Sequence, residues 1–257
     1  MRSITRRALR GIAAGLLAAG LAGCAAGRPP SAGDAAVGTG LAQAALHTGA
    51  PADALRLADH VLAHHPDATA ARLVRAEALS ALGQSDPARA DFAQVLRTRP
   101  HATAALLGLG RLQLAHDPAA AAALLRRALA SAPGNAAALT DLGIALDLQG
   151  RHRAAEVAYR QVLAVHPQLI AARVNLALSL AMQGQGPQAI ALLEPLARDP
   201  KAGAQLRQDY AAVLTMAGER GKAAAILAAD LPAPQAEAAL RAFAASGRPA
   251  AIDAAHP

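Results

Sequence analysis

The sequence predicts an all-α protein built from about six similar helix–turn–helix units. Three observations support this class. Alanine dominates the 257 residues, only 2% of residues are aromatic, and strand-forming residues are sparse. This composition favours helices, because alanine, leucine and arginine have high helix propensities. Proline recurs at a nearly constant interval, and glycine recurs near the middle of most intervals. A repeat of this kind predicts units that stack side by side into an elongated fold.

The N-terminal 23 residues have the composition of an export signal. Four arginines and no acidic residue accompany an apolar run from Ile12 to Ala22. A cationic start, a short apolar stretch and small residues before a cleavage point are typical of secretory signal peptides. The run has about 11 residues, whereas a membrane-spanning helix needs roughly 20. We therefore expect residues 1–23 to be removed on export, and the pair Arg6-Arg7 leaves the general and the twin-arginine route open.

Cys24 is the only cysteine of the chain, so it cannot form an internal disulfide. The stretch Leu21-Ala22-Gly23-Cys24 resembles the lipobox of bacterial lipoproteins, which implies that Cys24 is acylated and becomes the mature N-terminus. Ala25 follows where an inner-membrane retention signal often has aspartate. By resemblance to enterobacterial sorting, this implies the outer membrane, with the protein on its periplasmic face. The alternative is an ordinary signal peptide cleaved elsewhere, with Cys24 incidental.

Residues 24–34 are rich in glycine, proline and small side chains, and we interpret them as a flexible tether from the lipidated cysteine. Because the signal peptide holds four arginines and no acid, its removal lowers the formal net charge from +7 to +3. This modest charge, without a dense basic run, argues against nucleic acid as a partner.

Prolines mark a period of 33 to 34 residues. Each closes a phrase of similar wording, such as "VLAHHP" or "VLAVHP", and proline ends a helix because it lacks an amide hydrogen and clashes with the preceding turn. These prolines are Pro66, Pro100, Pro133, Pro167 and Pro200. A glycine suited to the left-handed residue that ends a helix lies mid-unit. These glycines are Gly49, Gly83, Gly150, Gly184 and Gly218. Each unit is therefore predicted to be helix, tight turn, helix and proline.

A helix–turn–helix period of 34 residues is the signature of tetratricopeptide (TPR) repeats, and residues 35–231 resemble that family throughout. In the clearest unit, Leu142-Gly143 match the Leu-Gly pair of the first helix, while Ala155 and Tyr159 match the small and aromatic positions of the second. We expect the two helices to touch at Gly143 and Ala155, and Tyr159 to fill the gap to the next repeat. The resemblance implies a right-handed superhelix.

The last part of the chain completes this domain. Residues 234–246 predict a further helix, whose apolar residues Ala238, Leu240 and Phe243 are available to cover the last repeat. Stacked repeats need such capped ends. We therefore place a TPR superhelical domain at residues 35–246, with a disordered tail at residues 247–257.

The sequence holds no pattern that predicts catalysis. It has no Ser-His-Asp order, glycine-rich phosphate loop or metal motif, so we expect no enzyme activity, cofactor, metal or small-molecule substrate. His60 and His64 are spaced so that one helix face carries both, as metal ligands on a helix are. The alternative, which we favour, is the exposed end of a second helix.

A TPR superhelix has a concave groove lined by its first helices, and the family's groove positions are carried over here by resemblance. They correspond to Asp141, Ile144, Asp147, Asn175, Leu178, Met182, Asp209, Ala212 and Met216. In peptide-binding TPR proteins an asparagine at the position of Asn175 often holds the ligand backbone, and an amide both donates and accepts. A solvated polar residue is an equal alternative. Met182 and Met216 suit either an adaptable apolar surface or packing between helices.

The C-terminal third resembles TadD-type TPR lipoproteins of the tight-adherence (Flp) pilus system. The resemblance rests on "RVNLALSLAMQG", on "LLEPLARDP" with Pro195 inside a second helix, on "LRQDYAAVLTMAG", and on Asp230-Leu231 before the last helix. Generic TPR repeats avoid such a proline, which costs roughly 3 kcal/mol inside a helix.

This resemblance implies a lipid-anchored, pilotin-like factor. It would help a secretin, the outer-membrane export ring, to localise or assemble by binding a peptide in its groove. The alternative is another outer-membrane TPR adaptor lipoprotein that serves envelope or peptidoglycan assembly.

Overall fold

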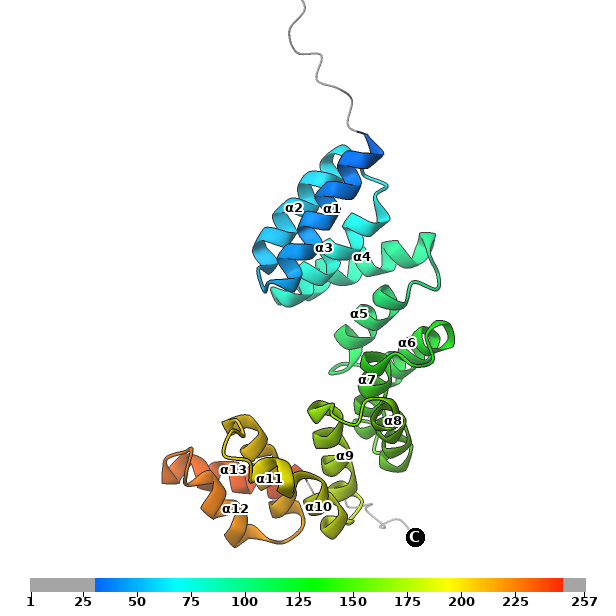
Figure 1. Cartoon of the computed structure of the whole chain (residues 1–257). Coiled ribbons are helices and arrows are strands. Elements are labelled where there is room, and N and C mark those ends of the chain that lie inside the picture. The colour runs from blue at the N-terminus through cyan, green and yellow to red at the C-terminus, as the bar shows by residue number, and fades with distance from the viewer. Residues whose placement is uncertain (1–30, 247–257) are drawn as a thin grey trace, which may run out of the picture.

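The computed structural model describes residues 31–246, and this range consists of thirteen α-helices without a strand. The helices follow one another along a curved path (Figure 1). They are α1 (Ala32–His47), α2 (Pro51–His64), α3 (Thr69–Ala81), α4 (Ser85–Thr98), α5 (Thr103–Gln113), α6 (Pro118–Ser131), α7 (Ala136–Asp147), α8 (His152–Val165), α9 (Ile170–Met182), α10 (Gly186–Ala197), α11 (Ala204–Met216), α12 (Arg220–Leu227) and α13 (Ala233–Ser246). The all-α class that the alanine-rich composition predicts is therefore confirmed.

The first twelve helices form six consecutive pairs, and α13 packs on the last pair. This confirms six helix–turn–helix repeats followed by one more helix. The period-marking prolines follow the second helix of the first five repeats by two or three residues. Each of these helices therefore ends before the residue that precedes the proline, because proline disfavours the helical conformation of that residue.

Glycine closes the turn between the two helices in five of the six repeats. Gly49, Gly83, Gly150, Gly184 and Gly218 have φ angles between +70° and +85°. This left-handed conformation costs glycine little because it has no Cβ. The turn of the third repeat has no glycine, and there the Asp117 carboxylate accepts a hydrogen bond from the Ala120 amide at 2.9 Å and caps α6.

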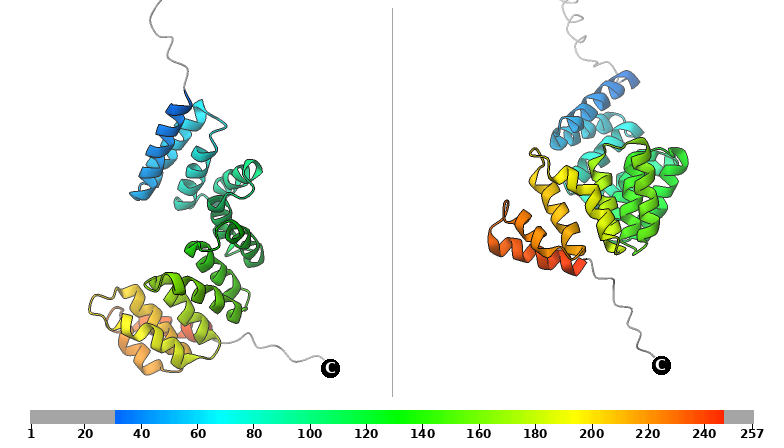
Figure 2. Two further views of the ribbon diagram at one scale, coloured as in Figure 1. Left: turned by 45° about the vertical axis from the view of Figure 1, so that its right-hand side comes forward. Right: turned by 60° about the horizontal axis from the view of Figure 1, so that its bottom comes forward.

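The helices form two layers. The odd-numbered helices contact one another directly from α1 to α13, whereas each even-numbered helix contacts only odd-numbered neighbours. Because one layer is closely stacked and the other is spread apart, the stack curves toward the odd-numbered helices, and both views of Figure 2 show the curved stack. We call the surface of the odd-numbered helices that faces the inside of the curve the inner face.

Alanine makes the close contacts within each repeat. One position in the second helix of every repeat is a fully buried alanine, namely Ala54, Ala88, Ala121, Ala155, Ala189 and Ala223. A single methyl group at this position lets the two helices of a repeat approach closely. The prediction that Ala155 lies at such a contact agrees with its complete burial.

Two fully buried aromatic side chains of the core, Tyr159 and Phe92, pack against glycine residues. A Cβ atom added to Gly143 would lie 2.3 Å from Cε1 of Tyr159, so the Tyr159 ring packs on its own repeat. Tyr159 also belongs to the core cluster that includes Val174 and Ala177 of α9, so this contact does not contradict the expectation that it fills the gap to the next repeat. The Phe92 ring of α4 packs against the next repeat, since a Cβ at Gly108 of α5 would lie 2.3 Å from its Cζ.

The buried core is continuous in one half of the molecule and divided in the other. One cluster of buried side chains runs from Ala121 in α6 to Leu240 in α13. Helices α1 to α5 are joined by three smaller clusters, centred on Phe92, Ala58 and Leu62. The C-terminal repeats therefore share one large apolar cluster, and two smaller clusters, around Ala138 and Val162, lie beside it.

The helical domain starts slightly earlier than the sequence indicated. The Ser31 hydroxyl accepts a hydrogen bond from the Asp34 amide at 3.3 Å, while the Asp34 carboxylate accepts one from the Ser31 amide at 2.8 Å. This capping box starts α1 at Ala32. Residues 32–34, predicted as the end of the tether, thus belong to the first helix.

The other predictions for the two ends lie outside the described residues. They are the signal peptide at 1–23, the acylation of Cys24 and the tail at 247–257. Between residues 31 and 246, none of the helices combines the length and the hydropathy that crossing a bilayer requires.

Candidate partner-binding face

The predicted groove residues lie on three neighbouring helices of the inner layer. Helix α7 contacts α9, and α9 contacts α11. Asp141, Asn175 and Asp209 occupy the same position in these successive repeats, so the fold places them in a row along the inner face. This row is the polar part of the candidate site.

Asn175 lies in the middle of the row with its amide available. The side chain is half-buried, and it has no hydrogen-bond partner among residues 31–246. A carboxamide offers two donors and an acceptor with two lone pairs. Asn175 can therefore pair with both the N–H and the C=O of a peptide unit of any sequence.

Asp141 is committed to an internal ion pair. Its side chain lies 2.6 Å from Nε of Arg111 on α5, and the residue is only 8% exposed. The pair joins two successive helices of the inner layer. Arg111 occupies in the third repeat the position that Ile144 occupies in the fourth. The repeat pattern could therefore have predicted Arg111 on the inner face, but the sequence analysis did not name it. Asp141 therefore stabilises the contact between α5 and α7, and its carboxylate is not free to bind a ligand.

Asp209 keeps a carboxylate without a cation. Within the described residues its one side-chain partner is Gln205, whose Nε2 donates to Oδ1 at 3.0 Å. Burial raises the pKa of Asp209, and the hydrogen bond from Gln205 opposes this rise. A negative charge in this setting favours a positively charged group on a bound partner.

A second unpaired carboxylate lies further along the inner layer, at Glu77 of α3. Burial raises the pKa of Glu77, with smaller opposing effects from the charges of His47 and Arg111. Within residues 31–246 it forms no salt bridge. Glu77, Arg111 and Asp209 thus leave the inner face with more negative than positive charge.

The apolar residues of the predicted site are partly covered. Ile144, Leu178 and Met216 are half-buried and pack against the large core cluster. Met182, at the end of α9, is also half-buried. Met216 therefore combines the two roles left open by the sequence, since one part packs between helices and the other part remains accessible.

Two predicted groove positions have structural roles instead. Ala212 of α11 is buried, with 6% exposure. The Asp147 carboxylate accepts hydrogen bonds from the Tyr159 hydroxyl at 3.0 Å and the Ser179 hydroxyl at 2.8 Å, and it contacts Nδ1 of His152 at 2.9 Å. Asp147 therefore ties α7 to α8 and α9, and burial together with this carboxylate raises the pKa of Tyr159.

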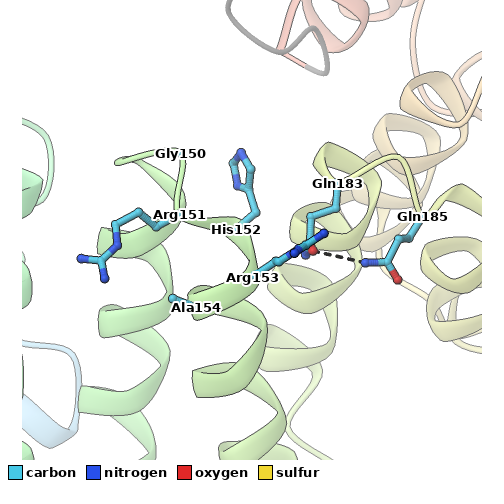
Figure 3. A pocket seen from close by; sticks show the side chains of 7 residues that line it. All are labelled: Gly150, Arg151, His152, Arg153, Ala154, Gln183 and Gln185. Carbon is cyan, nitrogen blue, oxygen red and sulfur yellow. Dashed lines mark hydrogen bonds between the residues drawn. The ribbon is translucent and has the colours of Figure 1, made fainter.

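An open cavity of about 710 Å³ lies beside this network, between the turns of the fourth and fifth repeats (Figure 3). Its lining residues are Gly150, Arg151, His152, Arg153, Ala154, Gln183 and Gln185. Gln185 donates to Gln183 at 3.2 Å, and Gln183 donates to Glu156 at 3.2 Å. Gln183, Gln185 and His152 therefore have partners, and His152 is held by Asp147, whereas the guanidinium groups of Arg151 and Arg153 form no hydrogen bond or ion pair within residues 31–246.

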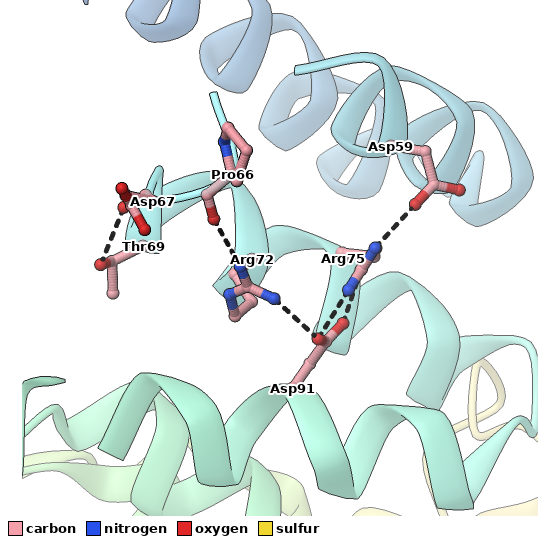
Figure 4. Close-up of polar contacts among 7 residues, drawn as sticks. All are labelled: Asp59, Pro66, Asp67, Thr69, Arg72, Arg75 and Asp91. Atoms are coloured by element: carbon pink, nitrogen blue, oxygen red, sulfur yellow. Dashed lines mark hydrogen bonds and ion pairs between the residues drawn. The ribbon is translucent and has the colours of Figure 1, made fainter. Parts of the chain in front are cut away.

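A charged network joins the first two repeats (Figure 4). Arg75 of α3 makes two hydrogen bonds to Asp91 of α4, at 2.6 and 2.7 Å, and one to Asp59 of α2 at 3.1 Å. Arg72 lies 3.6 Å from the same Asp91. Asp91 is only 5% exposed, and its hydrogen bonds raise the pKa of Arg75. This bidentate arrangement is the strong form of an ion pair, so its role is to join α2, α3 and α4.

The two histidines on α2 contact each other. The ring centroids of His60 and His64 are 4.9 Å apart in an edge-to-face arrangement, and both residues are exposed. In the part of the chain that the structure describes, no three His, Cys, Asp or Glu side chains are grouped as a metal site would need.

Comparisons with known proteins identify the fold. The profile of the tetratricopeptide-repeat family matches residues 135–167, which is the repeat of α7 and α8. A search of curated protein sequences found no significant match.

Solved structures match over much greater lengths. A tetratricopeptide-repeat protein from Parabacteroides merdae is 18% identical, with a TM-score of 0.62 and coverage of 86% of each chain. A thermophilic TPR protein of Thermus thermophilus is 21% identical, with a TM-score of 0.59, over 70% of this chain and 98% of its own. PilW, described as a widely conserved type IV pilus biogenesis factor, is 25% identical, with a TM-score of 0.66, over 81% of this chain and 92% of its own. The chain is therefore a tetratricopeptide-repeat protein by fold, suited to binding other proteins, with one repeat that also matches the family by sequence.

Proposed function

We propose that this protein is a lipid-anchored scaffold of pilus biogenesis that holds a segment of a partner protein on its inner face. The likeness to PilW carries this proposal, because it combines the highest TM-score reported above with 25% identity over nearly all of that chain. PilW is a type IV pilus biogenesis factor.

The residues of the inner face support a peptide as the bound group. The free amide of Asn175 suits a peptide backbone, and the accessible parts of Leu178, Met182 and Met216 suit apolar side chains. The unpaired carboxylates of Glu77 and Asp209 favour a segment that carries a basic residue. The surface therefore fits an extended partner segment of mixed apolar and basic character.

The finer assignment is to the tight-adherence pilus, with the secretin as partner. It is supported by the C-terminal stretches that resemble TadD-type proteins, including Pro195, which lies inside α10. On this proposal the protein is pilotin-like and assists secretin localisation or assembly.

The proposed anchor is an acylated Cys24 at the periplasmic face of the outer membrane. Residues 25–30 then separate the lipid from Ser31, where α1 is capped. A single acyl chain binds membranes only marginally, while two or three chains bind firmly at about 0.8 kcal/mol per buried CH₂. Such a tether concentrates the inner face near partners embedded in the same membrane.

Recovery of the secretin from detergent-solubilised outer membranes tests the partner. The wild-type chain should recover the secretin, and Asn175→Ala should reduce its recovery by about tenfold, the loss expected for one or two backbone hydrogen bonds. Gln188→Ala is the matched control, because Gln188 is an exposed amide on the outer helix α10. Equal recovery by both variants contradicts binding at Asn175, and failure of the wild-type chain to recover the secretin contradicts the secretin as partner.

Membrane fractionation tests the anchor separately. Cys24→Ser should move the protein from the outer-membrane fraction to the soluble periplasmic fraction, because the acyl group has no attachment point. An unchanged distribution would remove the lipoprotein assignment. Recovery of a different envelope protein, lost in Asn175→Ala, would instead assign the scaffold to the broader class of envelope adaptors.

A further inference from the structure

A half-enclosed cavity of about 460 Å³ lies between α10, α11 and α12, away from the inner face. Its lining residues are Ile190, Glu194, Ala197, Arg198, Arg207, Tyr210, Leu214, Lys222, Ala225 and Ile226. Helices α10 and α12 belong to the outer layer and do not contact each other, while α11 lies between them. The cavity therefore opens between two outer helices, with α11 as its floor (Figure 1 shows the three helices).

The lengths of the surrounding helices explain why space remains here. The outer helices α2, α4, α6 and α8 each have 14 residues, whereas α10 has 12 and α12 has only 8. Pro195 lies two residues before the end of α10, where it removes one backbone hydrogen bond. The two alanines of the lining, Ala197 and Ala225, add little volume. Short walls and small side chains thus leave an apolar space of the size that binds ligands.

Tyr210 supplies an unsatisfied polar group to this space. The residue is only 5% exposed, yet its hydroxyl forms no hydrogen bond within residues 31–246. Unlike the Ser80 hydroxyl, which is fully buried without a partner, the Tyr210 hydroxyl keeps some solvent-accessible area. The other buried tyrosine is different, because the Tyr159 hydroxyl donates to Asp147. The cavity floor therefore carries a hydroxyl that a ligand can pair with.

The three cations of the cavity rim are each ion-paired with a carboxylate, from Glu194, Asp230 or Glu219. Three of its four charged side chains are positive, namely Arg198, Arg207 and Lys222, and Glu194 is the fourth. Arg207 is fixed by two hydrogen bonds to Asp230, at 2.8 and 2.5 Å. It forms the rigid part of the rim.

The other two cations are held only by exposed ion pairs. Arg198 pairs with Glu194 at 2.7 Å and Lys222 with Glu219 at 3.1 Å, each within one turn, and their side chains are 76% and 68% exposed. Exposed pairs of this kind contribute little stability. Both side chains can therefore turn toward an acidic ligand at small cost.

We propose that this cavity is a second docking site, which takes a partner-protein segment with one bulky apolar side chain next to a carboxylate. The apolar side chain fills the space between Ile190, Leu214 and Ile226. The carboxylate accepts a hydrogen bond from the Tyr210 hydroxyl and pairs with Arg198 or Lys222. The sequence stretches around Pro195, Tyr210 and Asp230, which set this part of the chain apart from generic repeats, all meet at this cavity.

Two terminally blocked dipeptides, acetyl-Phe-Glu-amide and acetyl-Phe-Lys-amide, test this site with the ¹⁵N-labelled full chain in solution. The Phe-Glu peptide should shift the amide resonances of Tyr210, Ala225 and Ile226 in a saturable way, with an affinity at least about threefold higher than that of Phe-Lys, since one hydrogen bond or ion pair contributes such a factor. Absence of saturable shifts at the cavity, or equal binding of the two peptides, overturns the proposal.

Variants separate this site from the inner face. Ala225→Leu narrows the opening and should abolish the shifts. Tyr210→Phe should weaken binding of the Phe-Glu peptide by about three- to tenfold, and Lys222→Glu, at an exposed position, should reduce the preference for Phe-Glu. Asn175→Ala should bind the peptide like the wild-type chain. Unchanged binding by Ala225→Leu and Lys222→Glu, or its loss in Asn175→Ala, overturns the assignment to this cavity.

Discussion

At the scale of single residues, Gly143 sets how closely α7 approaches the Tyr159 ring. The ring cannot easily move away, because its hydroxyl is held by Asp147 at 3.0 Å. A Cβ placed at Gly143 would lie 2.3 Å from the ring, so Gly143→Ala should lower the free energy of unfolding by about 1–2 kcal/mol despite the better helix propensity of alanine. Urea denaturation measures this change.

Gly221→Ala is the matched control, since nothing lies within 4 Å of a Cβ at that helical position. It should leave stability unchanged or raise it by up to about 1 kcal/mol. Equal effects of the two substitutions would mean that the contact with Tyr159 does not limit the packing of this repeat.

Asp147 joins three helices through one carboxylate. Asp147→Ala leaves the hydroxyls of Tyr159 and Ser179 without their acceptor, and it should lower the free energy of unfolding by about 2–4 kcal/mol. Asp86→Ala removes an ion pair to Arg89 in which the aspartate side chain is 90% exposed, so it should cost less than about 1 kcal/mol. Chemical denaturation of both variants compares them, and a loss as small as that of Asp86→Ala would deny Asp147 this role.

The raised pKa of Glu77 determines how this residue makes the free energy of unfolding depend on pH. Because burial raises its pKa above the ordinary value of 4.5, the folded chain holds this proton more tightly than the unfolded chain. The stability that Glu77 contributes is therefore present below pH 4.5 and is lost as the pH rises through the raised pKa.

Glu77→Gln should accordingly be more stable than the wild-type chain at neutral pH, with a difference that shrinks toward pH 4. Unfolding free energies measured across this range test the prediction, and Asp67→Asn, at an exposed residue, is the control. A difference that grows as the pH falls has the opposite sign and would refute it.

Sequence reasoning at the residue scale succeeded where a local rule decides the outcome. The five turn glycines follow from the left-handed conformation that each turn needs. It was less successful for polar side chains such as Asp147 and Asp141, because the family register places them on the inner face but does not reveal their partners. Those partners, Ser179 and Arg111, lie about 30 residues away along the chain, so only the stacking of repeats brings them together.

At the scale of helices, α10 is the element whose sequence opposes its structure. Pro195 lies in its last turn, and replacing it restores one backbone hydrogen bond. Pro195→Ala should therefore raise the free energy of unfolding by about 1–2 kcal/mol, less than the roughly 3 kcal/mol of a helix centre. Thermal or urea unfolding measures the gain.

Pro187→Ala is the control within the same helix. Pro187 lies in the first turn of α10, where its fixed φ angle suits the helix and no hydrogen bond is lost. This substitution should leave stability unchanged or lower it slightly. If Pro195→Ala also gave no gain, the proline would cost the helix nothing where it stands.

At the same scale, the helix ends could be predicted from the sequence because proline and glycine fix them locally. The start of α1 was misplaced by three residues, because Gly33 and its small neighbours suggest a tether while the capping box of Ser31 and Asp34 starts the helix there.

At the scale of the whole molecule, α13 closes the stack. Ala236 and Leu240 are buried against the last repeat. A chain that ends after Leu231 should lose amide-exchange protection in α11 and α12, while α3 to α8 keep theirs, since stability in a repeat array is transmitted between neighbours. Hydrogen exchange measured helix by helix tests this, and uniform loss along the chain would mean that all repeats unfold as one unit.

The division of the apolar core gives the molecule uneven mechanical stiffness. The eight helices from α6 to α13 share one cluster, and α1 to α5 are linked through separate small ones. We therefore expect the C-terminal part to resist bending and the N-terminal repeats to deform more easily. We expect a pulling force applied to the two ends to lengthen the N-terminal repeats first, and the surface around Asn175 and the cavity at Tyr210 to keep their shape under that force.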